Sequence, residues 1–215
     1  MATPADDPQH DNAARHYFDA SPEVASSRHE VDISLPDRSL RLTSDRGVFA
    51  ADRLDAGTKF LLLEAPALAD DDKVVLDLGC GWGPIACVAA LRAPHAEVWA
   101  VDVNERARAL TTVNAAKIGA GDRLHVVAPD AIPAAVRFDR ILSNPPIRVG
   151  KAALRTLLVR WLDRLTPTGR AHLVVQRHLG SDSLARWLRE QGHPVDRLGS
   201  RAGYRILEVG PRETP

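Results

Sequence analysis

Cysteine, long apolar runs and net charge are all scarce in this sequence of 215 residues. Cys80 and Cys87 are the only cysteines, too few for a disulfide framework, and no spacing of His and Cys predicts a metal site. No run of about 18 apolar residues occurs, so we expect no membrane-spanning helix. The 28 basic and 28 acidic residues cancel, which argues against the broad basic field of a non-specific nucleic-acid-binding protein.

The amino-terminal stretch MATPADDPQHDNAARHYF is acidic and polar where a signal peptide is basic and then apolar. We therefore expect a cytoplasmic protein. Residues 1–14, rich in Asp, Pro, Ala and Asn, predict a disordered tail.

An extension that precedes the main fold is predicted over residues 15–69. Polar and apolar residues alternate over 29–36 and 38–45, on either side of Pro36-Asp37, which predicts a β-hairpin. Residues 52–65 are compatible with a helix that Pro66 ends, although Gly57 lies inside it.

Residues 70–215 predict the core of what we expect to be a single domain overall. Short apolar strands alternate with helical segments, and two strands in succession close the chain. The alternation predicts an α/β fold: a Rossmann-like, doubly wound, mostly parallel sheet of seven strands with an antiparallel C-terminal edge hairpin. The predicted strands are 74–79, 97–103, 124–130, 138–144, 170–176, 193–200 and 203–209, and the helices are 84–93, 105–117, 151–165 and 183–191.

A glycine-rich turn follows the first core strand, with the sequence DLGCGWGP over 77–84. Gly79 and Gly81 let the backbone approach a ligand closely, but their spacing differs from the G-x-G-x-x-G of dinucleotide-binding turns. Asp77 precedes them, and a carboxylate there favours a cationic amino group over a pyrophosphate. This pattern predicts S-adenosylmethionine as the cofactor and argues against an NAD-dependent oxidoreductase.

Acidic residues also end the next two predicted strands. Asp102 can accept hydrogen bonds from both ribose hydroxyls of an adenosine, as an acidic residue does at this place in nucleotide-binding folds. Asp130 and Ala131 follow the third strand, where the adenine ring is expected.

The fourth core strand ends in Ser-Asn-Pro-Pro-Ile over 143–147. Pro145 and Pro146 stiffen the backbone and remove two donors, so that the side-chain carbonyl of Asn144 and the backbone carbonyl of Pro145 can act as fixed acceptors. An exocyclic amine held by both can direct its lone pair at a methyl donor. Catalysis would then depend on positioning and desolvation, with no metal.

The motifs DLGCGWG, VDVN, PDA and SNPPI, in this order, resemble those of class I S-adenosylmethionine-dependent methyltransferases that act on amines. The hairpin, the segments SDRGVF and LDAGT, NPPIRVGK and the terminal GYRILE are similar to RsmC-type enzymes, single-domain branch, from residue 16 to 209. That family methylates N2 of a guanosine in 16S ribosomal RNA. The resemblance therefore implies this activity, with ribosomal RNA or the small ribosomal subunit as the partner.

The resemblance also implies roles for individual residues. The methionine part of the cofactor falls to the glycine loop, the ribose to Asp102, the adenine to Asp130 and Ala131, and the amine to the Asn-Pro-Pro turn. Asn144 is expected to border the cofactor as well, and a segment before the core is expected to close over it. The residues so implied are Asp77, Gly79, Gly81, Asp102, Asp130, Ala131, Asn144, Pro145 and Pro146, with Asp55, Gly57 and Thr58 in the closing segment.

Ile147 stands where many amino methyltransferases have a Tyr or Phe that stacks on the target base, so it can offer only an apolar contact. Arg148, Lys151 and Arg155 follow this turn and are candidates for contacts to RNA phosphates. Two alternatives stay open. One is a protein-glutamine or small-molecule amine methyltransferase, and the other is a non-catalytic RNA-binding factor in ribosome assembly.

Overall fold

A computed structural model describes residues 24–212 of the chain, apart from the side chain of Arg148. The predicted tail over 1–14, and the residues up to 23, lie outside the described part. Within it, no helix has the length and apolar character needed to cross a membrane. Nor do three or more His, Cys, Asp or Glu residues of residues 24–212 gather in a group that could hold a metal ion.

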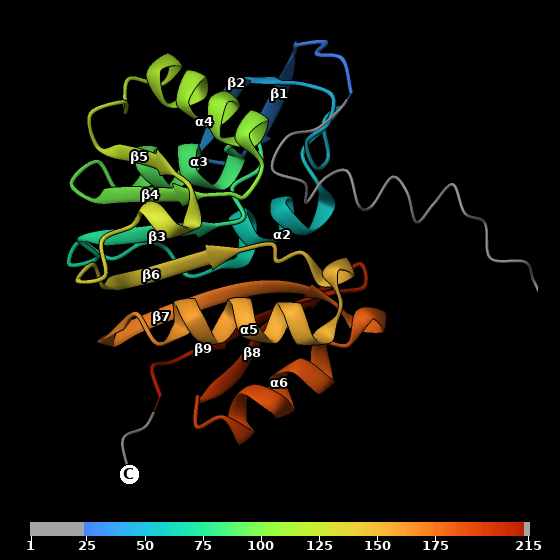
Figure 1. Cartoon of the computed structure of the whole chain (residues 1–215), viewed down its shortest axis with the longest axis vertical. Helices are drawn as coiled ribbons and strands as arrows, with labels where there is room; N and C mark the ends of the chain where they lie inside the picture. The colour runs from blue at the N-terminus through green and yellow to red at the C-terminus, as the bar shows by residue number, and fades with distance from the viewer. Residues whose placement is uncertain (1–23, 213–215) are drawn as a thin grey trace, which may run out of the picture.

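A seven-stranded sheet forms the centre of the molecule, in the order β5-β4-β3-β6-β7-β9-β8 (Figure 1). The first five strands of this order run parallel, and β9 and β8 are antiparallel to their neighbours. The predicted fold class, with its antiparallel C-terminal edge, is thereby confirmed. The strands are β3 (Val74–Leu78), β4 (Glu97–Val101), β5 (Leu124–Val127), β6 (Phe138–Ser143), β7 (Leu165–Gln176), β8 (Val195–Arg201) and β9 (Tyr204–Val209).

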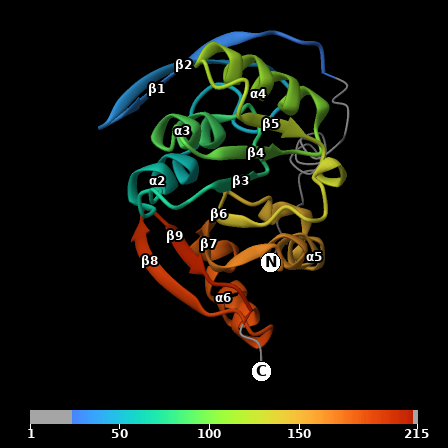
Figure 2. The same cartoon turned by 90° about the vertical axis from the view of Figure 1, so that its left-hand side faces the viewer.

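Helices cover both faces of the sheet, and each face has its own apolar core. Helices α2 (Ala56–Glu64), α3 (Pro84–Arg92) and α4 (Glu105–Lys117) pack on one face. Helices α5 (Lys151–Leu162) and α6 (Ser181–Glu190) pack on the other, as Figure 2 shows for α3 and α5. Small residues dominate α3, which is buried along almost its whole length and so lies close to the strands beneath it.

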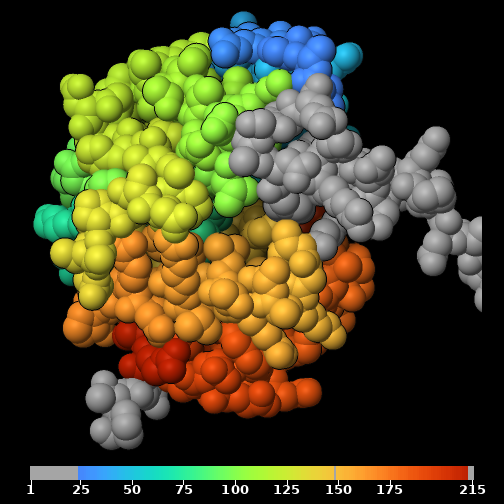
Figure 3. Space-filling model, in the orientation of Figure 1, coloured from blue at the N-terminus to red at the C-terminus, as the bar shows by residue number. Residues whose placement is uncertain are grey.

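The predicted N-terminal hairpin is present as β1 (His29–Leu35) and β2 (Arg38–Ser44), which pair over seven residues. Its inner side chains join the core that α3 and α4 cover. Asn114 of α4, fully buried, fixes it there: its Oδ1 accepts from the Thr43 amide (2.7 Å) and its Nδ2 donates to the Thr43 carbonyl (2.8 Å). In Figure 3 the hairpin lies at one end of the molecule and the C-terminal strands and α6 at the other.

Most elements differ from their predicted bounds by one or two residues, and four differ by three or more: α2, β7, β5, which ends at Val127 instead of 130, and α5, which ends at Leu162 instead of 165. The helix expected from residue 52 begins only at Ala56, because the Asp55 side chain accepts from the amides of Gly57 and Thr58 and so caps the helix there. Strand β7 begins at Leu165 instead of 170, and its register against β6 shifts between Phe138 and Arg140. Pro167 and Gly169 interrupt the alternation in that stretch, which is why the sequence pattern misses its first part.

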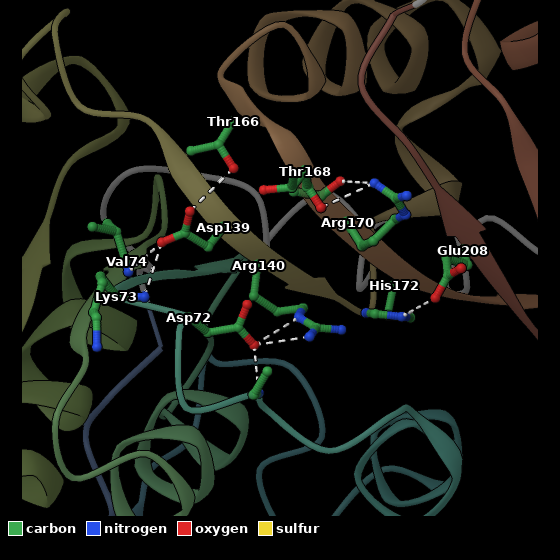
Figure 4. A network of polar contacts seen from close by, with 12 residues as sticks. Asp72, Lys73, Val74, Asp139, Arg140, Thr166, Thr168, Arg170, His172 and Glu208 are labelled. Atoms are coloured by element: carbon green, nitrogen blue, oxygen red, sulfur yellow. Dashed lines mark hydrogen bonds and ion pairs between the residues drawn. The ribbon is translucent and has the colours of Figure 1, made fainter.

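A polar network ties the amino-terminal ends of β3 and β6 together, away from the carboxyl ends where ligands are expected (Figure 4). The Asp139 carboxylate accepts from the amides of Lys73 (2.9 Å) and Val74 (3.0 Å). Next to it, the buried Arg140 guanidinium pairs with Asp72 at 2.8 Å. These contacts join β3 and β6 at the end of the sheet opposite their carboxyl ends.

Candidate functional site

A cavity of about 510 Å³ lies at the carboxyl ends of β3, β4, β6 and β7. Leu78, Val101, Asn144 and Gln176, which stand at or just past those four strand ends, all line it. The segment from Val48 to Thr58, which leads into α2, contributes further lining residues. Residues of the N-terminal extension and of the core therefore line the same cavity.

The glycine loop between β3 and α3 presents bare backbone to this cavity. Gly79 and Gly81 line it with φ angles of +78° and +56°, a left-handed conformation that favours glycine. A Cβ atom built on either would meet no atom within 4 Å. Gly83, by contrast, lies so close to Thr111 that a Cβ would stand 2.9 Å from that side chain. The loop thus packs against α4 at Gly83, and it faces open space in the cavity at Gly79 and Gly81.

Asp77 lies beneath the loop and is completely buried, so it does not itself line the cavity. Its Oδ2 accepts from the Ala86 amide at 2.9 Å, whereas Oδ1 has no hydrogen-bond partner among the described residues. Burial, with a smaller contribution from the charge of Asp102, raises the pKa of Asp77 to about 8. The site therefore contains an incompletely satisfied carboxyl group, which a cationic ligand group or a water molecule would stabilise.

Asp102 lines the cavity at the end of β4, and both of its oxygens are fixed by backbone amides. Oδ2 accepts from Gly81 (2.9 Å), and Oδ1 accepts from Asn104 (2.9 Å). Burial raises the pKa of this carboxyl group, and the hydrogen bonds from the backbone oppose that shift. Each oxygen keeps a lone pair for a further donor, so the pair of hydroxyls on a ribose fits the arrangement.

Asp130 and Ala131 do not reach the cavity lining. Both are exposed in the short 3-10 helix η1 (Pro129–Ala131), where Asp130 pairs with Arg160 of α5 at 2.8 Å. Their neighbour Pro129 lines the cavity instead. An adenine ring at this end would meet the proline, with the side chain of Asp130 turned to the surface.

The Asn144 amide has a defined polarity. Its Nδ2 donates to Asp55 Oδ2 (2.8 Å) and to Thr58 Oγ1 (3.0 Å), so Oδ1 is the amide atom left for a bound group. Asp55 and Thr58 line the cavity, and Gly57 is buried between them. These three residues, expected to close over a cofactor, thus include the two that orient Asn144. Pro145, Pro146 and Ile147 line the cavity next to it.

Several residues that line the cavity were not predicted from the sequence. Gln176 ends β7 and Tyr204 begins β9, and the Gln176 Nε2 donates to the Tyr204 hydroxyl at 2.8 Å. The rule that ligands bind at the carboxyl ends of parallel strands points to Gln176. Tyr204 begins β9, which runs antiparallel to β7, so the amino end of β9 lies beside the carboxyl end of β7. Phe49 and Leu179, large apolar side chains that remain exposed, also line the cavity.

The basic residues after the Asn-Pro-Pro turn differ in their surroundings. Lys151, the first residue of α5, is exposed, while Arg155 stacks over the Trp187 ring at 4.8 Å. Arg148 lies in the 3-10 helix η2 (Ile147–Val149), and its side chain is outside the described part of the structure. Of the two side chains that are described, Lys151 is the one whose charge faces solvent without such a contact.

A family model described as methyltransferase small domain matches residues 39–208. The uncharacterized protein YbxB of Bacillus subtilis is 30% identical over 199 residues, which cover 91% of this chain and 98% of that protein. Ribosomal RNA small subunit methyltransferase C of Shewanella halifaxensis is 34% identical over 186 residues, 84% of this chain and 51% of the relative.

Ribosomal RNA large subunit methyltransferase G of Streptomyces avermitilis is 37% identical over 145 residues, 65% of this chain and 38% of the relative. Among solved structures, the 16S rRNA N2 methyltransferase RsmC of T. thermophilus, in complex with AdoMet and guanosine, superposes with a TM-score of 0.75 at 23% identity. That match covers 89% of this chain and 52% of that one, and it concerns the fold. The chain thus spans about half or less of these ribosomal RNA methyltransferases and nearly all of YbxB.

Proposed function

This chain belongs to the methyltransferase small domain family of S-adenosylmethionine-dependent methyltransferases, and we propose that it methylates N2 of a guanosine in 16S ribosomal RNA. The observation that carries the proposal is the orientation of Asn144 by Asp55 and Thr58. It leaves a carbonyl oxygen as the polar group that meets the substrate, and a carbonyl oxygen selects a donor such as an amine.

The cavity is compatible with the cofactor on three grounds. Gly79 and Gly81 leave open space where side chains would otherwise project. Asp102 offers two fixed carboxylate oxygens to a ribose. Asp77, buried beneath the glycine loop, has one oxygen without a partner among the described residues, and its charge can attract the ammonium group of an amino acid through a water molecule. S-adenosylmethionine, when bound, supplies an electrophilic methyl group on a sulfonium sulfur.

The protein's part in the transfer is to position the amine and to exclude water. Asn144 Oδ1 and the Pro145 carbonyl accept the two hydrogens of the exocyclic amine, which draws its nitrogen out of conjugation with the ring and exposes a lone pair. The lone pair would then face the methyl group that S-adenosylmethionine supplies when bound, and the proton that the nitrogen loses after the transfer would pass to water. Fixed acceptors in a partly buried site need little reorganisation during this step, which is how they lower the barrier.

The choice of guanine N2 and of the small subunit rests on the relatives. The solved RsmC structure is named for 16S rRNA and N2 and contains guanosine, and small subunit methyltransferase C is 34% identical to this chain. Because a large subunit enzyme is also among the relatives, the test includes both RNAs.

The test is methyl transfer from radiolabelled S-adenosylmethionine to undermodified 16S rRNA, 23S rRNA, small subunits and a ribosomal protein fraction. We expect label in 16S rRNA or the small subunit, at N2 of one guanosine after nuclease digestion. Label in the protein fraction alone would indicate a glutamine or other amine methyltransferase. Cofactor binding with no transfer to any pool would favour the non-catalytic assembly factor.

A pair of variants separates the two halves of the proposed site. Asn144→Ala should lose most transfer while the affinity for S-adenosylhomocysteine stays within about three-fold, because Asn144 is expected to act on the amine. Asp102→Ala should weaken that affinity, since a hydrogen bond to a charged group contributes about 1.5–3 kcal/mol. Normal turnover by the Asn144→Ala variant would refute the proposed positioning of the amine.

A further inference from the structure

We infer that Gln176 and Tyr204 determine base specificity, by reading the O6 and N1–H groups of guanine next to the amine that Asn144 holds. The inference rests on the proposed function and extends it from the amine to the rest of the base. It starts from the hydrogen bond in which Gln176 Nε2 donates to the Tyr204 hydroxyl at 2.8 Å.

The position of this pair in the sheet favours a role with the substrate. The proposed cofactor groups follow β3 and β4, and Asn144 follows β6, the next strand. Gln176 ends β7, directly beyond β6, and Tyr204 opposes Gln176 in the β7–β9 register. Neighbouring strands lie about 4.8 Å apart, so the side chains at these three strand ends lie in the same part of the cavity and can converge on one bound group. The part of the cavity beyond Asn144 is therefore left for the group that is methylated.

The hydrogen bond between the two side chains gives each a defined polarity. The Tyr204 hydroxyl accepts from Gln176, so its own proton is available for donation. The amide nitrogen of Gln176 is occupied by this contact, and its Oε1, which accepts from no described donor, is available as an acceptor.

The cavity thus offers one donor, the Tyr204 hydroxyl, followed by two acceptors, Gln176 Oε1 and Asn144 Oδ1. The Watson–Crick edge of guanine presents the complement: an acceptor at O6, then donors at N1 and N2. Adenine reverses the first two groups and has no amine at position 2. A wrong base would therefore leave buried polar groups of the protein unpaired, which is what makes such a site selective.

A second observation shows that the Tyr204 ring fits closely against the residues that orient Asn144. A Cβ built on Gly57 would stand 2.7 Å from Cε1 of the ring and 3.0 Å from Asp55 Oδ2. The φ angle of Gly57 is not in the left-handed region, so the ring, and not the backbone conformation, is what excludes a larger residue there. Leu179 and Ile147, which also line the cavity, offer apolar surface for the faces of a base.

The test measures binding of guanosine, inosine and adenosine to the protein saturated with S-adenosylhomocysteine, so that adenosine cannot occupy the cofactor site. Inosine keeps O6 and N1–H but lacks the 2-amino group. We expect guanosine and inosine to bind, and adenosine to bind at least about ten-fold more weakly, as two mismatched hydrogen bonds require. Tyr204→Phe should weaken the binding of guanosine and of inosine by the same factor, about five-fold, because it removes the donor to O6. Asn144→Ala should weaken the binding of guanosine and leave the binding of inosine unchanged.

Gln176→Glu is the second variant, since its carboxylate would accept a hydrogen bond from the Tyr204 hydroxyl, so that this hydroxyl could no longer donate to O6, while the carboxylate still offers an acceptor to N1–H. Gln191→Glu at the end of α6, which does not line the cavity, is the control for the added charge. Unchanged binding of both nucleosides to the Tyr204→Phe and Gln176→Glu variants would overturn the inference and leave the proposed function intact. Equal binding of adenosine and guanosine to the parent protein would overturn it as well. Failure of guanosine and inosine to bind, with no transfer to ribosomal RNA, would instead count against the proposed function.

Discussion

Asp55 caps α2 through its Oδ2 and accepts from Asn144 with the same atom, so one substitution can separate these two roles. A serine is a good helix cap, but its hydroxyl is one bond shorter than the carboxylate and does not reach Asn144. In the Asp55→Ser variant the helix should stay capped while the Asn144 amide loses its charged acceptor. Thr58 then remains as its only acceptor of the two.

The expected effects can be estimated from these contacts. A hydrogen bond to a charged group contributes about 1.5–3 kcal/mol, so if all of it serves to hold Asn144 in the transition state, kcat falls by about 10- to 150-fold. Stability should change by less than about 0.5 kcal/mol, because the cap is kept. Asp55→Ala should lose the same activity and in addition about 1 kcal/mol of cap energy, which lowers Tm by about 2–4 °C in a protein of this size.

The assay is single-turnover methyl transfer to 16S rRNA, with S-adenosylhomocysteine affinity and Tm measured on the same preparations. The reasoning is refuted if Asp55→Ser transfers methyl groups at the parent rate, or if its Tm falls as far as that of Asp55→Ala. In the first case Asn144 does not need Asp55, and in the second the loss reflects the helix and not the orientation of the amide.

Three further perturbations test the site. Gly81→Val should place a side chain in the cavity and abolish the rise in Tm that S-adenosylhomocysteine causes; Gly119→Val, also at positive φ with open space but off the cavity, is the control. Asp77 has a pKa of about 8 in the folded protein, against an ordinary value of 3.8 for an unperturbed Asp. Its contribution to stability therefore falls as the pH rises from about 4 to 8, and the free energy of unfolding of Asp77→Asn should exceed that of the parent at pH 8. Loss of the same proton gives Asp77 a negative charge that attracts a cationic group, so the parent's Kd for S-adenosylhomocysteine should decrease from pH 6 to 8 and that of Asp77→Asn should not, as titration calorimetry can show. Lys151→Glu should lower the salt dependence of RNA binding by about 0.7 in logarithmic slope, whereas Lys73→Glu, at the opposite edge of the sheet, should leave it unchanged; equal slopes for the two variants would mean that Lys151 contacts no phosphate.

The fold could be predicted because its signals are local. A period-two pattern marked the N-terminal hairpin, and short apolar runs that alternate with helical segments marked the parallel strands. The glycine loop and Asp102 reach the cavity because ligands bind where parallel strands end, and those ends were visible in the sequence. The prediction weakened where tertiary contacts override the pattern, as in the first part of β7, where Pro167 and Gly169 break the alternation.

The roles of single residues in the site were harder to predict, because they depend on contacts between distant segments. Asp55 and Asn144 are 89 positions apart, and no spacing rule connects them. Asp130 was expected at a strand end, but it lies past β5 in η1, and its side chain pairs with Arg160 on α5, a helix whose position follows only from the packed fold. Sequence motifs therefore located the site, and the packing decided which side chains enter it.

The hydrogen bond between Asp55 and Asn144 also bears on how the chain is divided. The sequence suggested an extension over 15–69 in front of a core over 70–215, but the amide proposed to hold the substrate is oriented by two residues of the extension. Asn114 adds a second connection, since its Nδ2 donates both to the Thr43 carbonyl of the hairpin and to the Trp82 carbonyl of the glycine loop, each at 2.8 Å. A hairpin that shifts would disturb the loop proposed for the cofactor, and a first turn of α2 that frays would disturb the residue proposed for the amine. We therefore propose that the two parts form one cooperative unit, and that a core without its extension would lose the orientation of Asn144 even if its sheet still formed.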